Sequence, residues 1–350
     1  MPELPEVETV ARDLRPRLVG AEIAGVRSSW ARTLRTHDAE AFADAVIGRT
    51  IEVIGRRAKL LVLELSGGLA MTIHLKMTGQ LFVVPAESPE DAYVRLALEL
   101  VDGRELRFRD IRKFGKVGLY ERDPVTGDLV VERGGAGVFA ATGPEPLDDA
   151  FTVRAFRRRL RARRGRLKPL LLDQGFLAGI GNIYADEALW AARLHPLKPA
   201  AGLRPADERR LYDEIRRVLR EAVERRGSSI DDYTAPDGDG SMQDRLQVYQ
   251  RTGDPCPRCG RPIRRVVVGA RSTHFCSWCQ RLRAPERTGA AAILRTMTGG
   301  LRRGRRWSEL PGGEGSIGLT RDEQARAREE RTKRAAATRR AAARAAAGGG

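Results

Sequence analysis

The chain has 350 residues and carries 63 Lys and Arg against 46 Asp and Glu, a formal net charge of +17. A charge excess of this size indicates a polyanionic partner, and nucleic acid is the first candidate. The hydrophobic fraction of 41% is sufficient for buried cores in about two or three domains. No run reaches the ~20 apolar residues of a membrane helix, and the acidic N-terminus lacks the features of a signal peptide. These features exclude a membrane protein and an exported protein, and we expect a cytoplasmic location.

The first ten residues, MPELPEVETV, predict a helix that begins at Leu4. Pro5 has no N–H to lose in a first helical turn, and acidic side chains near it favour the positive end of the helix dipole. Apolar residues recur at helical spacing and form a stripe that can be buried, at Val7, Val10 and Leu14. Pro2 and Glu3 precede the helix and add nothing to that stripe, so the pattern alone leaves them without a structural reason.

The rest of the chain changes character twice. Short apolar or alternating runs, separated by Gly and Asp-Gly turns, extend from about residue 21 to 132 and predict a two-layer β domain. A joint rich in Gly and Pro separates it from a segment with Leu, Ala and Arg at helical spacing that runs to about Arg226. We therefore expect an α+β fold of several domains, with a leading helix and a β-sandwich first and a helical domain second. Beyond about Gly289 the chain offers no apolar face large enough to bury, which predicts disorder or only transient helix.

The four cysteines form two C-x2-C pairs separated by sixteen residues, Cys256 with Cys259 and Cys276 with Cys279. This spacing lets four thiolates reach one ion, and a closed tetrahedral zinc site folds its module rather than catalysing a reaction. The segment between the pairs alternates as a β-hairpin does, with its turn near Gly269, Ala270 and Arg271. Such a hairpin can carry Arg271 into a DNA groove; the alternative is an ordinary turn arginine.

A basic run and a glycine-rich loop follow each other in the helical segment. Nine basic residues and no acidic one occur between Arg154 and Lys168. An unbalanced run favours phosphate contact, since a solvated charged face is usually balanced by glutamates. The loop from Gly179 to Asn182 precedes an apolar helix, and the two form a candidate phosphate site at a helix N-terminus. The alternative is that the glycines serve only a tight turn.

Loops of the β domain hold further candidates for DNA contact. Lys59 lies in an apolar strand, where a lysine that ends the strand and reaches water is the simpler interpretation. Met77, Arg112 and Phe114 follow strands, and side chains of these types suit wedges that enter a base stack. Single exposed apolar residues are also normal on protein surfaces, so both interpretations stay open.

Taken in order, several strings resemble those of the formamidopyrimidine-DNA glycosylases: PELPEVET, RRAK, the HLKMTGQ and RKFG loops, GPEPL, KPLLLDQGFLAGIGNIYADE, LQVY and the four-cysteine hairpin. The resemblance covers residues 2 to about 281. It implies a helix-two-turn-helix arrangement in the helical domain and, after it, a zinc-finger β-hairpin with four cysteine ligands. Endonuclease VIII, the relative that removes oxidised pyrimidines, shares this layout, whereas Leu4 and the loop 228–245 look more like the purine-directed branch.

The resemblance implies that Met1 is removed and that the secondary amine of Pro2 attacks C1′ of a damaged nucleoside. An α-amino group titrates near ~8 and lysine near ~10.4, so far more of the α-amine is neutral at physiological pH. Its adduct with the opened sugar is a cationic iminium, an electron sink for β- and then δ-elimination. By the same resemblance Glu3 moves protons at the sugar and Lys59 is a general acid in the lyase steps. Arg271 holds a phosphate and assists the last elimination, while Glu6 orients the N-terminal loop.

The resemblance also implies a set of DNA contacts. Side chains of the two β-domain loops fill the gap left by an extruded base, from Met77, Arg112 and Phe114. Backbone phosphates around the flipped nucleotide are held by side chains of the helical domain, from Arg163, Lys168 and Asn182. Thr78 departs from the family pattern, which commonly carries Ser at that position.

We therefore expect five segments: a catalytic β-sandwich domain at 1–132, a linker at 133–150, a helical DNA-binding domain at 151–250 with a lesion loop at 228–245, a zinc finger at 251–283 and a basic, disordered tail at 284–350. The expected protein is a monomeric glycosylase and abasic-site lyase with one structural Zn²⁺ that removes oxidised purines from double-stranded DNA. The alternatives are the same chemistry on oxidised pyrimidines and a catalytically silent zinc-finger DNA-binding protein. The tail adds nonspecific DNA contacts or is a solvated extension.

Overall fold

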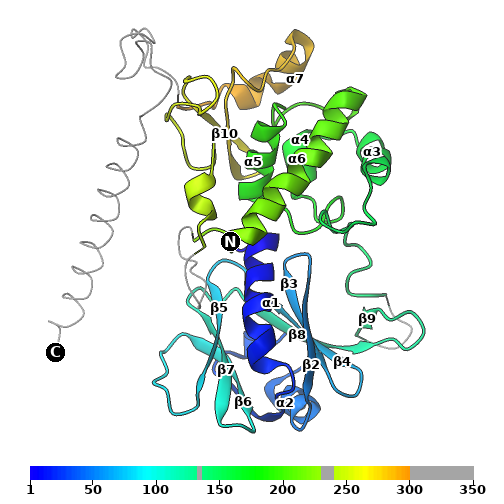
Figure 1. Ribbon diagram of the computed structural model, residues 1–350, viewed down its shortest axis with the longest axis vertical. Helices are drawn as coiled ribbons and strands as arrows, with labels where there is room; N and C mark the ends of the chain where they lie inside the picture. Colours follow the sequence, from blue (N-terminus) through cyan, green and yellow to red (C-terminus); the bar gives the residue numbers. More distant parts are fainter. Residues whose placement is uncertain (132–135, 230–239, 300–350) are drawn as a thin grey trace, which may run out of the picture.

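Helix α1 (Leu4–Leu18) stands at the centre of the molecule and joins its two halves (Figure 1). The computed structural model describes residues 1–131, 136–229 and 240–299. Leu4 packs in the core of the C-terminal half, whereas Val7, Val10 and Leu14 pack in the core of the N-terminal half. The predicted helix and its apolar stripe are confirmed, and the first turn of this helix lies where the two halves meet.

The N-terminal half is a sandwich of two antiparallel sheets that share one hydrophobic core with α1, as the sequence predicted. One sheet has the strand order β1-β6-β7-β5 and the other has the order β2-β3-β4-β8-β9. The strands span β1 (Ile23–Ser28), β2 (Ile51–Arg57), β3 (Leu60–Leu65), β4 (Leu69–His74), β5 (Gly79–Pro85), β6 (Val94–Leu100), β7 (Arg104–Asp110), β8 (Lys116–Arg122) and β9 (Leu129–Val130). Between β1 and β2, where the sequence predicted mostly strand, lie the 3-10 turn η1 (Ala31–Thr33) and helix α2 (Ala39–Val46).

The C-terminal half is helical up to the cysteine module. Its elements are α3 (Val153–Arg161), α4 (Leu167–Leu172), α5 (Asn182–Ala191), η2 (Ala200–Gly202), α6 (Pro205–Glu224) and η3 (Met242–Arg245). Every residue of α5 from Ile183 to Leu189 is buried, so this helix is the internal element around which the others pack. Just beyond α6, Arg226 forms a bidentate ion pair with Asp13 of α1 (2.9 and 2.7 Å), which ties the two halves together.

The cysteine module carries the predicted hairpin, formed by β10 (Arg264–Val268) and β11 (Arg271–Phe275). Gly269 and Ala270 both have positive φ (55° and 59°), the geometry of a two-residue hairpin turn that follows the twist of its strands. The turn lies where the sequence placed it, and Arg271 is the first residue after it.

The chain beyond the predicted zinc finger is ordered for another sixteen residues and includes helix α7 (Ala284–Leu294). A small core forms between α7 and the hairpin, from Leu197, Val266, Val268, Phe275, Leu282, Ala290, Ile293 and Leu294. Arg265 and Thr298 then exchange two backbone hydrogen bonds (3.0 and 2.8 Å). The prediction of a disordered tail is wrong for residues 284–299, because the apolar partners of α7 lie on the hairpin and not in its own sequence. Residues 300–350 lie outside the described part.

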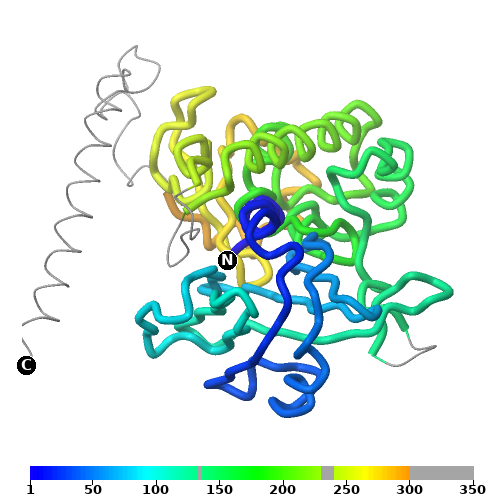
Figure 2. The backbone as a smooth tube through the Cα atoms, turned by 60° about the horizontal axis from the view of Figure 1, so that its bottom comes forward, coloured from blue at the N-terminus to red at the C-terminus, as the bar shows by residue number. Residues whose placement is uncertain are grey.

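Figure 2 shows the N-terminus in the region where the two halves approach each other. Most of the predicted lesion loop, residues 230–239 of 228–245, lies outside the described residues. Within the described ranges, no helix is both long and apolar enough to cross a membrane.

Candidate active site at the domain junction

The glycine-rich loop of the C-terminal half receives the N-terminus. The backbone N–H of Leu4 donates to the carbonyl of Gly179 (3.0 Å). Gly179 has a φ of +80°, and a Cβ built there would lie 2.7 Å from Cβ of Leu4. Only glycine fits, because both the backbone conformation and the packing against α1 exclude a side chain. This contact fixes the buried Pro2 in the junction. Met1 precedes Pro2 as an amide here, so a free amine requires removal of Met1.

The carboxylate of Glu3 occupies the N-terminus of α5. It accepts hydrogen bonds from the backbone N–H groups of Gly181 (2.6 Å) and Ile183 (2.8 Å), and Glu3 is only 1% exposed. Helix N-termini favour negative charge because their first N–H groups have no partner within the helix. The sequence predicted a phosphate at this position; the structure instead gives these donors to the carboxylate next to Pro2.

The side chain of Lys59 meets Glu3 beside Gly181. A Cβ built at Gly181 would lie 2.5 Å from Oε1 of Glu3 and 2.7 Å from Nζ of Lys59, so both polar groups pack against bare backbone. Burial raises the pKa of Glu3, although the charge of Lys59 partly offsets the rise. Burial lowers the pKa of Lys59, although Glu3 partly offsets the fall. Both shifts favour the uncharged forms, and they bring an acid and an amine closer to the pH at which proton transfer is efficient.

A glutamate from the linker holds the turn that carries Lys59. Lys59 is the second residue of the turn between β2 and β3, and Ala58 before it has a φ of +55°. Glu145 accepts from the backbone N–H of Ala58 (2.7 Å) and pairs with Arg56 and Arg57 (2.8 Å each). Although burial opposes the charge, these partners hold the pKa of Glu145 below its usual range. Sequence reasoning missed this role, because the GPEPL string contains no signal that connects it to a turn so far away in the chain.

Glu6 holds the N-terminal turn from within α1. Its Oε2 accepts from the backbone N–H of Glu3 (2.8 Å), and its Oε1 accepts from the hydroxyl of Tyr184 (2.5 Å) and the N–H of Ser228 (2.8 Å). Burial, together with the charge of Glu6, raises the pKa of Tyr184 well above its usual value. These contacts support the predicted role of Glu6 in orienting the N-terminal loop.

His74, at the end of β4, is a site residue that sequence reasoning missed. Its Nδ1 accepts a hydrogen bond from the backbone N–H of Lys76 (3.1 Å). Burial, followed by the charges of Lys76 and Lys59, lowers the pKa of His74 to about 4. The imidazole is therefore neutral at physiological pH, and it adds no charge to the electrostatic surroundings of Lys59. His74 is the first residue of the HLKMTGQ string, from which sequence reasoning selected only Met77 and Thr78.

Asp110 joins the two loops that are predicted to enter the base stack. Its carboxylate accepts from the hydroxyl of Thr78 (2.5 Å) and from the backbone N–H of Gly115 (2.7 Å). The hydroxyl oxygen of Thr78 in turn accepts from the N–H of Arg112 (3.2 Å). Thr78 thus supplies a hydroxyl at the position where the sequence departs from Ser.

The three predicted wedge residues project from these connected loops. Phe114 is 50% exposed, and the guanidinium of Arg112 lies 5.0 Å from the centre of its ring. Met77 is half-buried in the loop between β4 and β5. Their exposure is compatible with the predicted contact to DNA bases, which stays a prediction.

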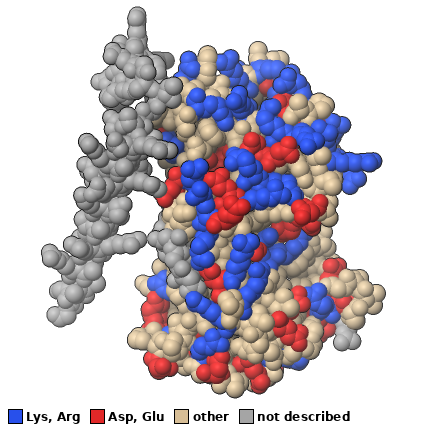
Figure 3. Space-filling view, in the orientation of Figure 1, with Lys and Arg blue, Asp and Glu red and all other residues tan. Residues whose placement is uncertain are grey.

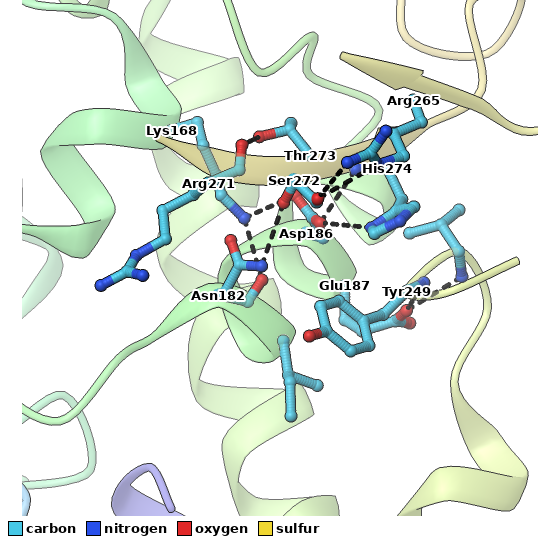
Figure 4. A network of polar contacts seen from close by, with 12 residues as sticks. Lys168, Asn182, Asp186, Glu187, Tyr249, Arg265, Arg271, Ser272, Thr273 and His274 are labelled. Atoms are coloured by element: carbon cyan, nitrogen blue, oxygen red, sulfur yellow. Dashed lines mark hydrogen bonds and ion pairs between the residues drawn. The ribbon is translucent and has the colours of Figure 1, made fainter. Parts of the chain in front are cut away.

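Arg271 extends away from a polar network that lies behind it (Figure 4). The residue is exposed, and its positive charge contributes to the lowered pKa of Lys59, so the two cations interact. Asn182, in the first turn of α5, donates from Nδ2 to the backbone carbonyl of Ser272 (3.0 Å). The amide group of Asn182 therefore binds the hairpin here, and its contact with phosphate stays a prediction.

Lys168 is not available for the phosphate contact that the sequence predicted. It is fully buried, and its Nζ donates to Oδ1 of Asp186 (2.6 Å) and to the carbonyl of Asn182 (2.9 Å). The prediction was wrong because the acidic partner comes from the next helix, outside the basic run.

The remainder of the basic run divides between internal contacts and solvent. Glu208 of α6 pairs with Arg161 (2.8 Å) and Arg157 (3.4 Å), and it supplies acidic charge that the run itself lacks. Arg163 is exposed, and its side chain makes no hydrogen bond or ion pair with the described part of the chain. It stays a predicted phosphate contact. Figure 3 shows basic side chains gathered over the C-terminal half of the face in view.

The four cysteines converge as the sequence predicted. The Sγ atoms of Cys256, Cys259, Cys276 and Cys279 all lie within 4.8 Å of one another. Two of these residues are buried and two are half-buried, and the described residues offer no other donor in the group. Four thiolates are the donor set of a closed structural zinc site. One structural Zn²⁺ is therefore the cofactor of this module.

Three family models match the chain in order. The formamidopyrimidine-DNA glycosylase N-terminal domain matches residues 1–117, the formamidopyrimidine-DNA glycosylase H2TH domain matches residues 142–234, and the zinc finger found in FPG and IleRS matches residues 253–282. A β-sandwich, a helix-two-turn-helix domain and a four-cysteine hairpin around a buried acid and amine define a zinc-containing DNA repair glycosylase.

Individual relatives specify the family. The chain is 49% identical over 282 residues to the formamidopyrimidine-DNA glycosylase of Chloroflexus aurantiacus, which covers 80% of this chain and 98% of the relative. It is 46% identical to that of Herpetosiphon aurantiacus, over 80% of this chain and all of the relative. A Lactococcus lactis FPG mutant in complex with Fapy-dG containing DNA superposes with a TM-score of 0.74 at 37% identity, covering 80% of this chain and 100% of that one. The chain belongs to the formamidopyrimidine-DNA glycosylase family.

Proposed function

We propose that this protein is a bifunctional DNA glycosylase and abasic-site lyase that removes oxidised purines, such as 8-oxoguanine and formamidopyrimidines, from double-stranded DNA. The observation that carries the proposal is the buried group at the domain junction, where α5 and the β2–β3 turn gather Pro2, Glu3 and Lys59. The net charge of +17 and the Fapy-dG DNA bound by the structural neighbour agree with this substrate.

In the proposed reaction the free amine of Pro2 attacks C1′ of the damaged nucleotide, and the glycosidic bond breaks with its electron pair leaving on the base. The proton of the attacking amine passes to the departing base, which restores a lone pair on the nitrogen. Glu3 protonates the ring oxygen of the sugar, the ring opens, and the nitrogen lone pair completes an iminium. Loss of a C2′ proton then expels the 3′ phosphate, and loss of a C4′ proton expels the 5′ phosphate. Addition of water at the iminium carbon finally releases Pro2.

The burial of the site supports these roles. The raised pKa of Glu3 favours a carboxyl group that has a proton to donate to the sugar oxygen. The lowered pKa of Lys59 favours an amine that exchanges protons during the elimination steps.

Borohydride trapping tests the proposal, because only an amine that forms an iminium becomes reduced onto DNA. Purified protein, with Met1 removal confirmed by intact mass, is incubated with duplexes that carry 8-oxoguanine opposite cytosine or an abasic site. We expect a crosslink with the wild type, none with Pro2→Gly, and none on the 8-oxoguanine duplex with Glu3→Gln. Glu40→Gln, an exposed glutamate of α2 outside the buried group, is the matched control and should trap normally. Absence of a wild-type crosslink despite tight DNA binding would favour the silent zinc-finger protein.

A substrate panel decides between the two enzymatic alternatives. Faster trapping on an oxidised thymine than on 8-oxoguanine would assign the protein to oxidised pyrimidines. We also propose that the enzyme is a monomer that acts on DNA in the cytoplasm, with a catalytic β-sandwich domain at 1–132, a helical DNA-binding domain at 151–250 and a zinc finger at 251–283 that supplies Arg271.

A further inference from the structure

Helix α5 contacts elements of the proposed active site from two directions. Its N-terminal N–H groups hold the carboxylate of Glu3, as described above. Its side chains Asn182 and Asp186, one helical turn apart, face strand β11 of the zinc hairpin (Figure 4). Oδ2 of Asp186 accepts from the backbone N–H of His274 (2.9 Å), and Oδ1 accepts from Nζ of Lys168 (2.6 Å).

These contacts bind the outer edge of a two-stranded sheet. Among the described residues, β11 pairs with one strand only, β10. On the other side the carbonyl of Ser272 accepts from Asn182 (3.0 Å) and the N–H of His274 donates to Asp186. Ser272 directly follows Arg271, so the hairpin is attached to α5 immediately behind the residue that carries the exposed guanidinium.

We propose that Asp186 is a positioning residue. It holds Arg271 at a fixed place relative to the end of α5 that binds Glu3, so that Arg271 is already in position for δ-elimination when β-elimination is complete. The inference rests on the proposed function and adds to it a residue that does not touch the substrate.

The burial of this pair separates positioning from direct contact. Lys168 and Asp186 form an ion pair with each other, and both side chains are fully buried. Because neither side chain reaches the surface, neither can contact DNA. An effect of their substitution on the reaction must therefore pass through the groups that they hold, the hairpin at His274 and the first turn of α5 at Asn182. The alternative is that the pair only stabilises the fold, in which case all steps are affected alike.

The test uses the double variant Lys168→Met with Asp186→Asn, which leaves no unpaired buried charge. Asp186→Glu is the second variant, in case the double variant does not fold, because it keeps a negative charge beside Lys168 but displaces the carboxylate that holds the N–H of His274. Lys198→Gln is the matched control, because Lys198 forms a similar largely buried ion pair with Glu286 (2.8 Å) that attaches the hairpin module through α7 rather than through β11. Each protein is compared with the wild type for zinc content, melting temperature and single-turnover cleavage of abasic DNA, with β and β,δ products separated on a gel.

We expect the Asp186 variants to retain zinc and to form the borohydride crosslink at a rate close to that of the wild type. Their δ-elimination is expected to be slower by about 10- to 100-fold, the size of loss that a small misplacement causes. The same substitutions added to Arg271→Ala should cause no further loss, because residues that act through one group are not additive. Unchanged partition between β and δ products, equal slowing of both steps, or an equal effect of Lys198→Gln would overturn the inference. Absence of a wild-type crosslink would instead refute the proposed function itself.

Discussion

Replacement of Gly181 by alanine tests whether the bare backbone of this residue positions both Glu3 and Lys59. The φ of Gly181 is −130°, a conformation open to alanine, so the substitution acts through its added methyl group alone. That methyl would lie 2.4 Å from Cδ of Glu3 and 2.7 Å from Nζ of Lys59, distances at which both groups must move. Movement of the Glu3 carboxylate would lengthen and weaken the hydrogen bonds that it accepts from the backbone N–H groups of Gly181 (2.6 Å) and Ile183 (2.8 Å).

The expected size of the effect follows from these bonds. Hydrogen bonds to charged groups contribute ~1.5–3 kcal/mol each, and partial rotation of Glu3 preserves some of that. A loss of about 3 kcal/mol in transition-state stabilisation corresponds to base excision about a hundredfold slower. The assay is single-turnover excision of 8-oxoguanine, with Gly165→Ala as the control because a methyl group added at Gly165 would meet no atom within 4 Å. Excision at the wild-type rate by Gly181→Ala would refute the geometry of the Glu3 and Lys59 pair.

Three other predictions concern stability and metal binding. Because the pKa of His74 falls from 6.5 to about 4 on folding, the unfolded chain binds more protons in that window, and stability falls as pH falls through it. The free energy of unfolding, measured with urea at pH 7 and at pH 4, should therefore differ by up to about 3 kcal/mol less in His74→Gln than in the wild type. An unchanged difference between the two pH values would contradict this prediction. Chelation of zinc, or Cys276→Ser, should lower DNA affinity in anisotropy titrations, since the hairpin loses its fold; full affinity without zinc would contradict this. Glu145→Gln should lower the melting temperature and slow trapping, because the N–H of Ala58 and two arginines lose a charged partner, and normal trapping would contradict this.

Features that depend on neighbouring residues were predictable from the sequence. The stripe at Val7, Val10 and Leu14 predicts α1, because helical spacing alone determines which side chains share a face. The two C-x2-C pairs predict the metal site for a similar reason, since short spacing limits where thiolates can point. The hairpin turn at Gly269 and Ala270 follows from local alternation of side chains.

Features that depend on distant partners were not predictable. Lys168 looked like a phosphate ligand because its own segment contains no acid, yet its counter-charge, Asp186, comes from another helix. The N-terminus of α5 looked like a phosphate site because the carboxylate that fills it, Glu3, comes from the start of the chain, far from α5 in sequence. The contacts of Glu145 with Ala58 and the two arginines were missed for the same reason, because they also join segments that are far apart in the sequence. In each case the missing information is a contact between segments that only the folded chain brings together.

Helix α7 has a consequence for the solubility of shortened forms of this protein. The zinc-finger match ends at residue 282, so a chain trimmed to the family's length would lose α7 and the strand-like segment at Thr298. Such trimming would uncover Val266 and Phe275, and would leave the backbone N–H and C=O of Arg265 without the partners they have at Thr298. An apolar strand with an unpaired edge is a template for association with other chains. We therefore expect a chain that ends at residue 282 to associate with itself more readily than one that keeps residues 283–299.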